Sequence, residues 1–232
     1  MGALTHVAID GPAGSGKTTV ARALAGRLGS LYLDTGAMYR ALAFEALRRG
    51  YDPSDETALV ALACERPVRI VSDANAAEGF VVYAGDERLG EEIYGSAVGG
   101  VVSVIAAHPR VRELMVERQR AIARSGPVVM AGRDIGTVVL PDASVKIFLT
   151  ASVPERVRRR RAELAARGTI VDEATVRSEM EERDRLDTTR AVAPLRPAVD
   201  AHMIDSSGLG VGQVVDRIAE LVERSMRSNG VP

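Results

Sequence analysis

Residues 11 to 18 read Gly11-Pro12-Ala13-Gly14-Ser15-Gly16-Lys17-Thr18 and follow directly on the apolar run Val7-Ala8-Ile9. This is the G-x-x-x-x-G-K-[ST] pattern of a phosphate-binding loop between a strand and a helix. Glycines let backbone N–H groups turn toward a polyphosphate, and the following helix presents its positive end there. In such a loop the lysine reaches the outer phosphates and the threonine can ligate Mg²⁺. The stretch therefore predicts a site for a nucleoside triphosphate.

Lysine is nearly absent from the rest of the chain. Of 30 basic residues only Lys17 and Lys146 are lysines, so arginine occupies almost every place where either residue would serve. Lys17 is thus an exception that needs a reason, and the phosphate loop supplies one.

Composition restricts the class of protein. A chain of 232 residues with 46% hydrophobic residues suits one globular domain with a small insertion. The formal net charge of −1 argues against a nucleic-acid partner, because such binding depends on a net basic surface. No apolar run approaches a membrane span and no charged leader precedes the loop, so we expect a cytoplasmic protein without a membrane partner. The single cysteine, Cys64, excludes a disulfide framework and is expected in the core.

Strand and helix patterns alternate along most of the chain. Strands are expected at 5–10, 31–34, 128–130, 145–149 and 201–205, and helices at 18–28, 35–49, 90–107, 109–125, 152–167, 172–190 and 213–226. Such alternation predicts an α/β fold whose parallel sheet is covered by helices on both faces. Ligands are then expected at the carboxyl ends of the strands.

A β-rich segment interrupts this alternation. Val68, Ile70 and residues 80–83 form short apolar runs separated by turn residues, which predicts a small antiparallel subdomain inserted into the α/β core. We therefore divide the chain into a core at about 1–60, 105–150 and 195–232, an insert at about 61–104 and a lid at about 155–190.

An arginine run lies in the expected lid. Arg158 to Arg161 are consecutive and follow a capping box formed by Ser152 and Glu155. Consecutive helical positions point nearly all the way round, so at most two of these arginines can face one ligand. We interpret the segment as a flap that carries arginines to the phosphates and excludes water.

Two acidic residues end expected strands next to these motifs. Asp10 precedes the phosphate loop and Asp34 precedes the second expected helix. At either position a carboxylate can bind Mg²⁺ or cap backbone N–H groups, and the sequence leaves both roles open.

Six motifs, in order over nearly the whole chain, resemble those of the bacterial cytidylate kinases. They are IDGPAGSGKTT at 9–19, LDTGAMYRA at 33–41, HPRVRE at 108–113, GRDIGTVVLPDA at 132–143, KIFL at 146–149 and ERDRLDTTRAVAPL at 182–195. The loop alone identifies only a superfamily, whereas GRDIGTVV and RAVAPL together separate this group from adenylate, thymidylate and shikimate kinases. The resemblance implies a P-loop kinase core with a parallel sheet, an inserted antiparallel monophosphate-binding subdomain and a helical lid.

The same resemblance implies a site for ATP and Mg²⁺. Its expected residues are Gly11, Pro12, Ala13, Gly14, Ser15, Gly16, Lys17, Thr18 and Thr19, with Thr18 as the metal ligand. The catalytic cations that it implies are Lys17, Arg133, Arg190, Arg159 and Arg160. An arginine on the transferring phosphoryl group can supply about 10³ to 10⁵ in rate.

The resemblance also implies an acceptor site. Its expected residues are Asp34, Thr35, Gly36, Tyr39, Arg40, Ser103, Arg112, Arg133, Asp134, Arg183, Asp187 and Arg190. By analogy, Arg40 and Arg133 hold the CMP phosphate with Tyr39 alongside, Ser103, Arg112 and Asp134 read cytosine, and Arg183 and Asp187 contact the sugar. The chemistry agrees, because a carboxylate can accept from the cytosine N4 amino group, a pattern that uracil inverts.

We therefore expect the reaction ATP + CMP ⇌ ADP + CDP, with dCMP also accepted, catalysed by a monomer. A kinase for another small acceptor, such as UMP, AMP or shikimate, is the alternative enzyme. A nucleotide-dependent switch is a further alternative, although the chain has no N-K-x-D guanine-recognition motif.

Three residues depart from the family pattern. Ala131 stands where an acid is common, which leaves Asp10 or Asp34 to help hold Mg²⁺. Tyr94 stands where relatives often have arginine, and Leu186 interrupts a usually charged stretch; we expect both to be peripheral.

Overall fold

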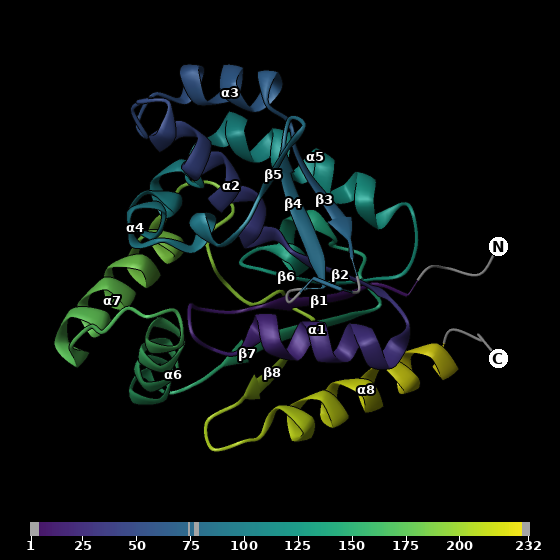
Figure 1. The fold of residues 1–232 in the computed structure, drawn as a ribbon. Coiled ribbons are helices and arrows are strands. Elements are labelled where there is room, and N and C mark those ends of the chain that lie inside the picture. The colour runs from purple at the N-terminus through teal and green to yellow at the C-terminus, as the bar shows by residue number, and fades with distance from the viewer. Residues whose placement is uncertain (1–4, 74, 77–78, 229–232) are drawn as a thin grey trace.

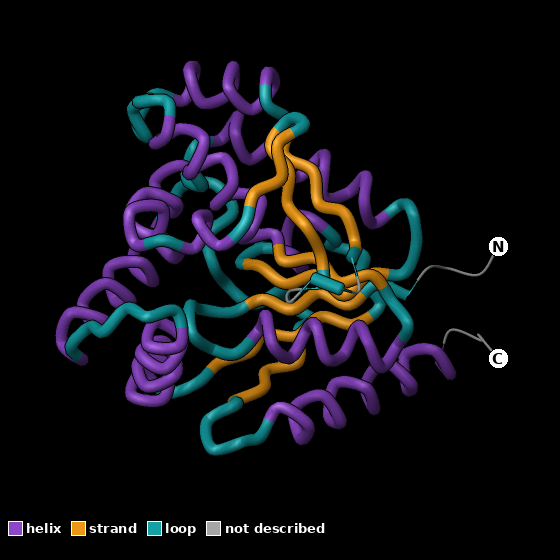
Figure 2. The backbone as a smooth tube through the Cα atoms, viewed as in Figure 1, coloured by secondary structure: helices purple, strands orange, loops and turns teal. Residues whose placement is uncertain are grey.

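The fold is built on a five-stranded parallel sheet with the strand order β2-β6-β1-β7-β8 (Figures 1 and 2). A computed structural model describes residues 5–73, 75, 76 and 79–228. The strands are β1 (Val7–Asp10), β2 (Leu31–Asp34), β6 (Val128–Gly132), β7 (Val145–Thr150) and β8 (His202–Asp205). The central strands β1 and β6 are buried along their whole length, as expected for a sheet covered on both faces.

Helices cover both faces of this sheet (Figure 1). On one face α1 (Lys17–Leu28) packs against α8 (Val211–Ser228), and on the other lie α2 (Thr35–Arg48) and α5 (Pro109–Ala123). The π-helical turn η2 (Ile135–Val139) follows β6 and contacts α5. The predicted α/β class is therefore confirmed, and the strand carboxyl ends with their loops meet at one edge.

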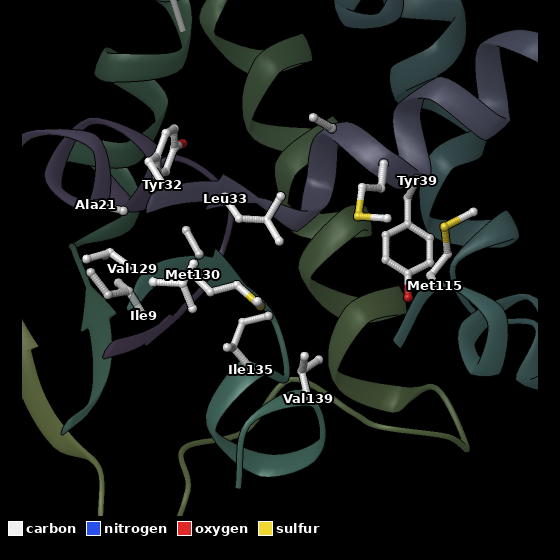
Figure 3. Close-up of a cluster of buried hydrophobic side chains, with 14 of the residues drawn as sticks. Ile9, Ala21, Tyr32, Leu33, Tyr39, Met115, Val129, Met130, Ile135 and Val139 are labelled. Carbon is white, nitrogen blue, oxygen red and sulfur yellow. The ribbon is translucent and has the colours of Figure 1, made fainter. Parts of the chain in front are cut away.

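Apolar side chains from the strands and helices interlock in one main core (Figure 3). Ile9, Leu33 and Met130 come from three neighbouring strands and are fully buried. Ile135 packs beside them from the turn after β6, which fixes the start of that turn against the sheet.

The predicted antiparallel insert is confirmed. It consists of β3 (Val68–Ser72), β4 (Phe80–Ala84) and β5 (Glu87–Leu89), paired antiparallel in that order and preceded by α3 (Glu56–Glu65). The ring of Phe80 lies 5.6 Å from that of Tyr32 in β2, so the insert packs directly on the core sheet.

Two long helices, α6 (Val153–Ala166) and α7 (Glu173–Thr189), pack against each other beside the carboxyl ends of the strands (Figure 1). Val157, Val176 and Met180 form a small apolar cluster of their own between them. This helix pair corresponds to the predicted lid; the division of the chain into core, insert and lid stays a prediction.

Several local predictions were wrong. The single helix expected at 90–107 is two elements, a 3-10 turn η1 (Glu91–Tyr94) and α4 (Ser96–Ile105), because Gly95 between them has an extended ψ of 158°. Cys64 is exposed, since Leu62 and Ala63 occupy the buried face of α3. Ser152 precedes α6 but its side chain makes no cap, and Glu155 pairs with Arg158 and Arg159 instead.

No helix among the described residues combines the length and the apolar character needed to cross a membrane.

Candidate active site

The phosphate loop connects β1 to α1 and has the backbone that its glycines predict. Gly11 has a φ of 153°, and a Cβ there would lie 2.1 Å from the carbonyl oxygen of Leu149. Only glycine fits this close approach between the loop and β7.

Lys17 is buried at the start of α1. Its Nζ donates to the carbonyl of Pro12 at 2.7 Å and lies 3.5 Å from Ser15 Oγ. Burial lowers the pKa of Lys17 well below its usual value, and repulsion from Arg133 adds to this effect. A bound polyphosphate would offset both effects, so the environment of this cation favours an anionic ligand.

Thr18 and Asp34 face each other beside the loop. Thr18 Oγ1 donates to Asp34 Oδ2 at 3.3 Å, while Asp34 Oδ1 accepts from the N–H of Gly36 at 2.9 Å and caps α2. Asp34 thus caps a helix and also presents an oxygen next to the expected metal ligand. Thr19 is exposed, and Thr35 donates its hydroxyl to the carbonyl of Ala131 at 3.0 Å.

The carboxylate of Asp10 accepts hydrogen bonds from the backbone with both of its oxygens. Its two carboxylate oxygens accept from the N–H groups of Ile135 at 2.7 Å and Gly136 at 2.8 Å. Asp10 therefore joins the strand before the phosphate loop to the turn that follows Arg133 and Asp134. Burial raises the pKa of Asp10 to about 6, although both N–H groups oppose this shift.

This raised pKa predicts a pH-dependent term in stability. Between about pH 4 and pH 6 folded Asp10 holds a proton that the unfolded chain has lost, so its contribution to the free energy of unfolding falls as pH rises. We expect Asp10→Asn to remove this decline, which amounts to roughly 3 kcal/mol at most. Urea unfolding of the wild type and of Asp10→Asn from pH 4 to pH 7 measures this decline. An equal decline in the two proteins would contradict the raised pKa of Asp10.

Four arginines from separate parts of the chain form one group beside Lys17, and two of them, Arg133 and Arg183, act on Lys17 itself. Arg40 comes from α2, Arg133 follows β6, Arg183 comes from α7 and Arg160 from α6. Burial lowers the pKa of Arg183 to about 9, with repulsion from Arg133 and Arg40 next in importance. Burial likewise lowers the pKa of Arg40, with repulsion from Arg160 as the next cause. The structure thus brings Arg40 and Arg133, predicted for the acceptor phosphate, together with Arg160 and with Arg183, which was predicted to contact the sugar.

The buried guanidinium of Arg183 is poorly compensated by its neighbours. Its Nε is buried without a hydrogen-bond partner among the described residues. Arg133, by contrast, donates from Nε to Asp187 Oδ2 at 2.7 Å. Ser103 donates to the other oxygen of Asp187 at 3.2 Å, so the structure places Ser103 with the expected sugar contacts.

A second group lies around a buried ion pair. Arg112 donates to Asp134 Oδ2 and, at 3.0 Å, to the carbonyl of Ala106, and its guanidinium lies 5.5 Å from the Tyr39 ring centre. Arg190 lies here too, with Nη2 3.6 Å from Asp134 Oδ1. Its Nε donates to the carbonyl of Ala193 at 2.7 Å, and Ala193 has a left-handed φ of 51°. The structure thus places Arg190 with the expected base-reading residues rather than with Lys17.

The arginines of α6 have different positions. Arg158 and Arg161 pair with Glu155 and Glu173 on the surface. Arg159 donates to the carbonyls of Ser15 at 3.3 Å and Ser206 at 2.8 Å, so it braces the back of the phosphate loop. Arg160 pairs with Glu163 at 2.9 Å and is the one of these four whose charge acts on both Arg40 and Arg183.

Sequence reasoning missed two residues that hold the loop and lid together. Arg156 donates to the carbonyl of Ala13 at 3.1 Å and to Asp184 Oδ2 at 2.5 Å. Ser206 Oγ lies 3.0 Å from the carbonyl of Ser15 and accepts from Arg159 at 2.9 Å. Helical spacing could have indicated Arg156, which lies three and four residues before Arg159 and Arg160. No pattern in the sequence indicates a role for Ser206.

Tyr94 also differs from expectation. Its ring centre lies 5.7 Å from the guanidinium carbon of Arg40, a member of the cation group. The expectation that Tyr94 is peripheral is therefore wrong.

Known proteins with similar sequences are cytidylate kinases. The cytidylate kinase from Pelotomaculum thermopropionicum is 54% identical to this chain, over 98% of this chain and 100% of the relative. The cytidylate kinase from Rhodococcus opacus is 49% identical over 94% and 95% of the two chains. A solved structure of an uncharacterized protein from Eubacterium ventriosum aligns with 94% of this chain at a TM-score of 0.52 and 14% identity, which supports the fold alone.

A sequence model of the family described as cytidylate kinase matches residues 7–224. The match includes the phosphate loop, both groups of charged residues and the two lid helices. Together with relatives that are about half identical over 95% or more of their length, it establishes that the chain belongs to the cytidylate kinase family.

Proposed function

We propose that the protein transfers the γ-phosphoryl group of ATP to CMP, giving ADP and CDP, and that it also accepts dCMP. The observation that carries this proposal is the pair of charged groups at one edge of the sheet. One has excess cations beside the phosphate loop, and the other contains a buried carboxylate and guanidinium suited to a pyrimidine edge. A kinase acting between two nucleotides needs both.

The first group suits the transferring phosphoryl group and the acceptor phosphate. In-line transfer spreads negative charge over several oxygens, and positioned cations stabilise that charge. We assign Lys17 to the ATP phosphates, and Arg40 and Arg133 to the CMP phosphate. The acceptor phosphate is largely ionised at neutral pH, so these residues need no general base beside them.

The second group suits cytosine. Asp134 would accept from the N4 amino group and Arg112 would donate to the N3 and O2 edge. Arg183 and Asp187 are assigned to the sugar. Arg190, which contacts Asp134 here, would have to turn toward the phosphates to act in transfer.

Mg²⁺ fits the oxygens beside the loop. Thr18 Oγ1 and Asp34 Oδ2 are adjacent hard oxygen donors, whereas both oxygens of Asp10 are used by backbone N–H groups. No cluster of three or more metal-binding side chains occurs among the described residues. This suits Mg²⁺ held mainly by phosphates and water, with the ion neutralising charge on the triphosphate. Ala131 is then compensated by Asp34.

The lid completes the site. Arg156 and Arg159 attach α6 to the carbonyls of Ala13 and Ser15, so the lid and the phosphate loop form one unit. Excluding water at this point would prevent transfer of the phosphoryl group to a water molecule. We expect the enzyme to act as a monomer in the cytoplasm.

An acceptor panel tests the function. We expect ADP release to require CMP or dCMP, with kcat/KM for CMP about 10- to 100-fold above that for UMP, because uracil offers an acceptor where Asp134 needs a donor. AMP and shikimate are the remaining acceptors to compare. If adding CMP does not increase ADP release, or if any other acceptor is phosphorylated faster, the proposal is overturned.

A further inference from the structure

One aromatic ring lies between the insert and the lid. Tyr94 ends the turn η1, which follows the last strand of the insert. The guanidinium carbon of Arg167, directly after α6, lies 4.4 Å from the ring centre, and that of Arg40 in α2 lies 5.7 Å from it. A single side chain therefore contacts a lid arginine and an arginine of the cation group.

Two like charges near each other need a compensating group. The face of an aromatic ring is electronegative and attracts guanidinium groups at these distances. Arg40 is already destabilised as a cation by burial and by Arg160, so an additional cation nearby would be unfavourable. A neutral ring can therefore hold both arginines without adding to this repulsion.

An ion pair supports the same junction. Arg167 Nε lies 3.5 Å from Glu91 Oε2 in η1, and Arg167 Nη1 lies 3.5 Å from Glu163 Oε1 in α6. Glu91 is 70% exposed, so this pair contributes little to holding the lid. Most of the attraction between lid and insert at this point is thus assigned to the ring.

We propose that Tyr94 is a positioning residue that joins the lid to Arg40 and so holds this arginine in place for the acceptor phosphate. The inference rests on the proposed function, in which Arg40 binds that phosphate. The ring contacts Arg167 and Arg40 at the same time, so it fixes the position of Arg40 relative to the lid. Losing the ring weakens the acceptor end of the site and leaves the phosphate loop unchanged.

Kinetics of three variants test this role. For Tyr94→Leu we expect KM for CMP to rise about 3- to 30-fold, from the usual strength of a guanidinium–ring contact. KM for ATP should stay within about twofold, and the fraction of ATP hydrolysed without CDP formation should rise. Tyr94→Phe keeps the ring and should behave like wild type. Tyr83→Leu is the matched control, since its ring holds Arg69 at 5.4 Å within the insert.

A double-mutant cycle gives a second test, which does not rely on correct folding of the Tyr94→Leu variant by itself. Arg167→Met should raise KM for CMP to a similar extent, and adding Tyr94→Leu should raise it little further. Additive effects, equal rises in both KM values, or a Tyr94→Phe variant as impaired as Tyr94→Leu would overturn the inference. The unmutated protein is assayed in the same experiment. If it phosphorylates CMP, the proposed function holds and these outcomes concern Tyr94 alone.

Discussion

Replacing Lys17 by methionine is expected to lower kcat for CMP about 10²- to 10³-fold, the usual loss when one preorganised electrostatic group is removed. Methionine has a similar length but no charge. Nζ of Lys17 donates to the carbonyl of Pro12 at 2.7 Å, and burial together with repulsion from Arg133 lowers its pKa, so a bound polyphosphate would stabilise its charge. A coupled assay of ADP release measures the loss.

The stability of the same variant separates catalysis from folding. Because a buried cation is costly, Lys17→Met should keep or increase the free energy of unfolding in urea. Arg27→Met is the control, since Arg27 lies on the same helix but pairs with Asp216 on the surface. Wild-type turnover by Lys17→Met would show that the assigned role of the phosphate loop is incorrect.

Replacing Asp134 by alanine is expected to impair both stability and acceptor binding. The side chains of Arg112 and Asp134 are only 4% and 7% exposed, and removing the carboxylate leaves a buried guanidinium uncompensated. The loss in unfolding free energy should be about 3 to 5 kcal/mol. Because cytosine also loses its acceptor, kcat/KM for CMP should fall about 30- to 10³-fold. Urea unfolding and CMP saturation kinetics measure the two effects.

A double variant distinguishes these two causes. Arg112→Met combined with Asp134→Leu removes both charges, so it should recover much of the lost stability while CMP turnover stays low. KM for ATP should change little in both variants, since Thr18 and Lys17 lie in the other group. Unchanged stability of Asp134→Ala would show that the ion pair does not support the fold.

Sequence reasoning was most successful where a pattern is local. The glycines and Lys17 of the phosphate loop, the alternating strands and helices, and the β-rich insert all depend on neighbouring residues, and the structure confirms their elements. It failed at two places where the pattern did not show which residue ends a helix or which helix face is buried. Gly95 splits an expected helix, and Cys64 lies on the outer face of α3 because Leu62 and Ala63 turn inward.

For the charged site, the sequence indicated the residues but not the contacts between them. Its arginines and aspartates could be named from the sequence, because they lie in motifs that resemble those of a known family. Their pairings could not, since Arg112 with Asp134 is separated by 22 residues, Ser103 with Asp187 by 84, and Asp10 with Ile135 by 125. Hydrogen bonds depend on atoms meeting within about 3 Å. Local chain chemistry therefore sufficed for the phosphate loop and the α/β fold, while only folding brings Tyr94 into contact with both Arg40 and Arg167.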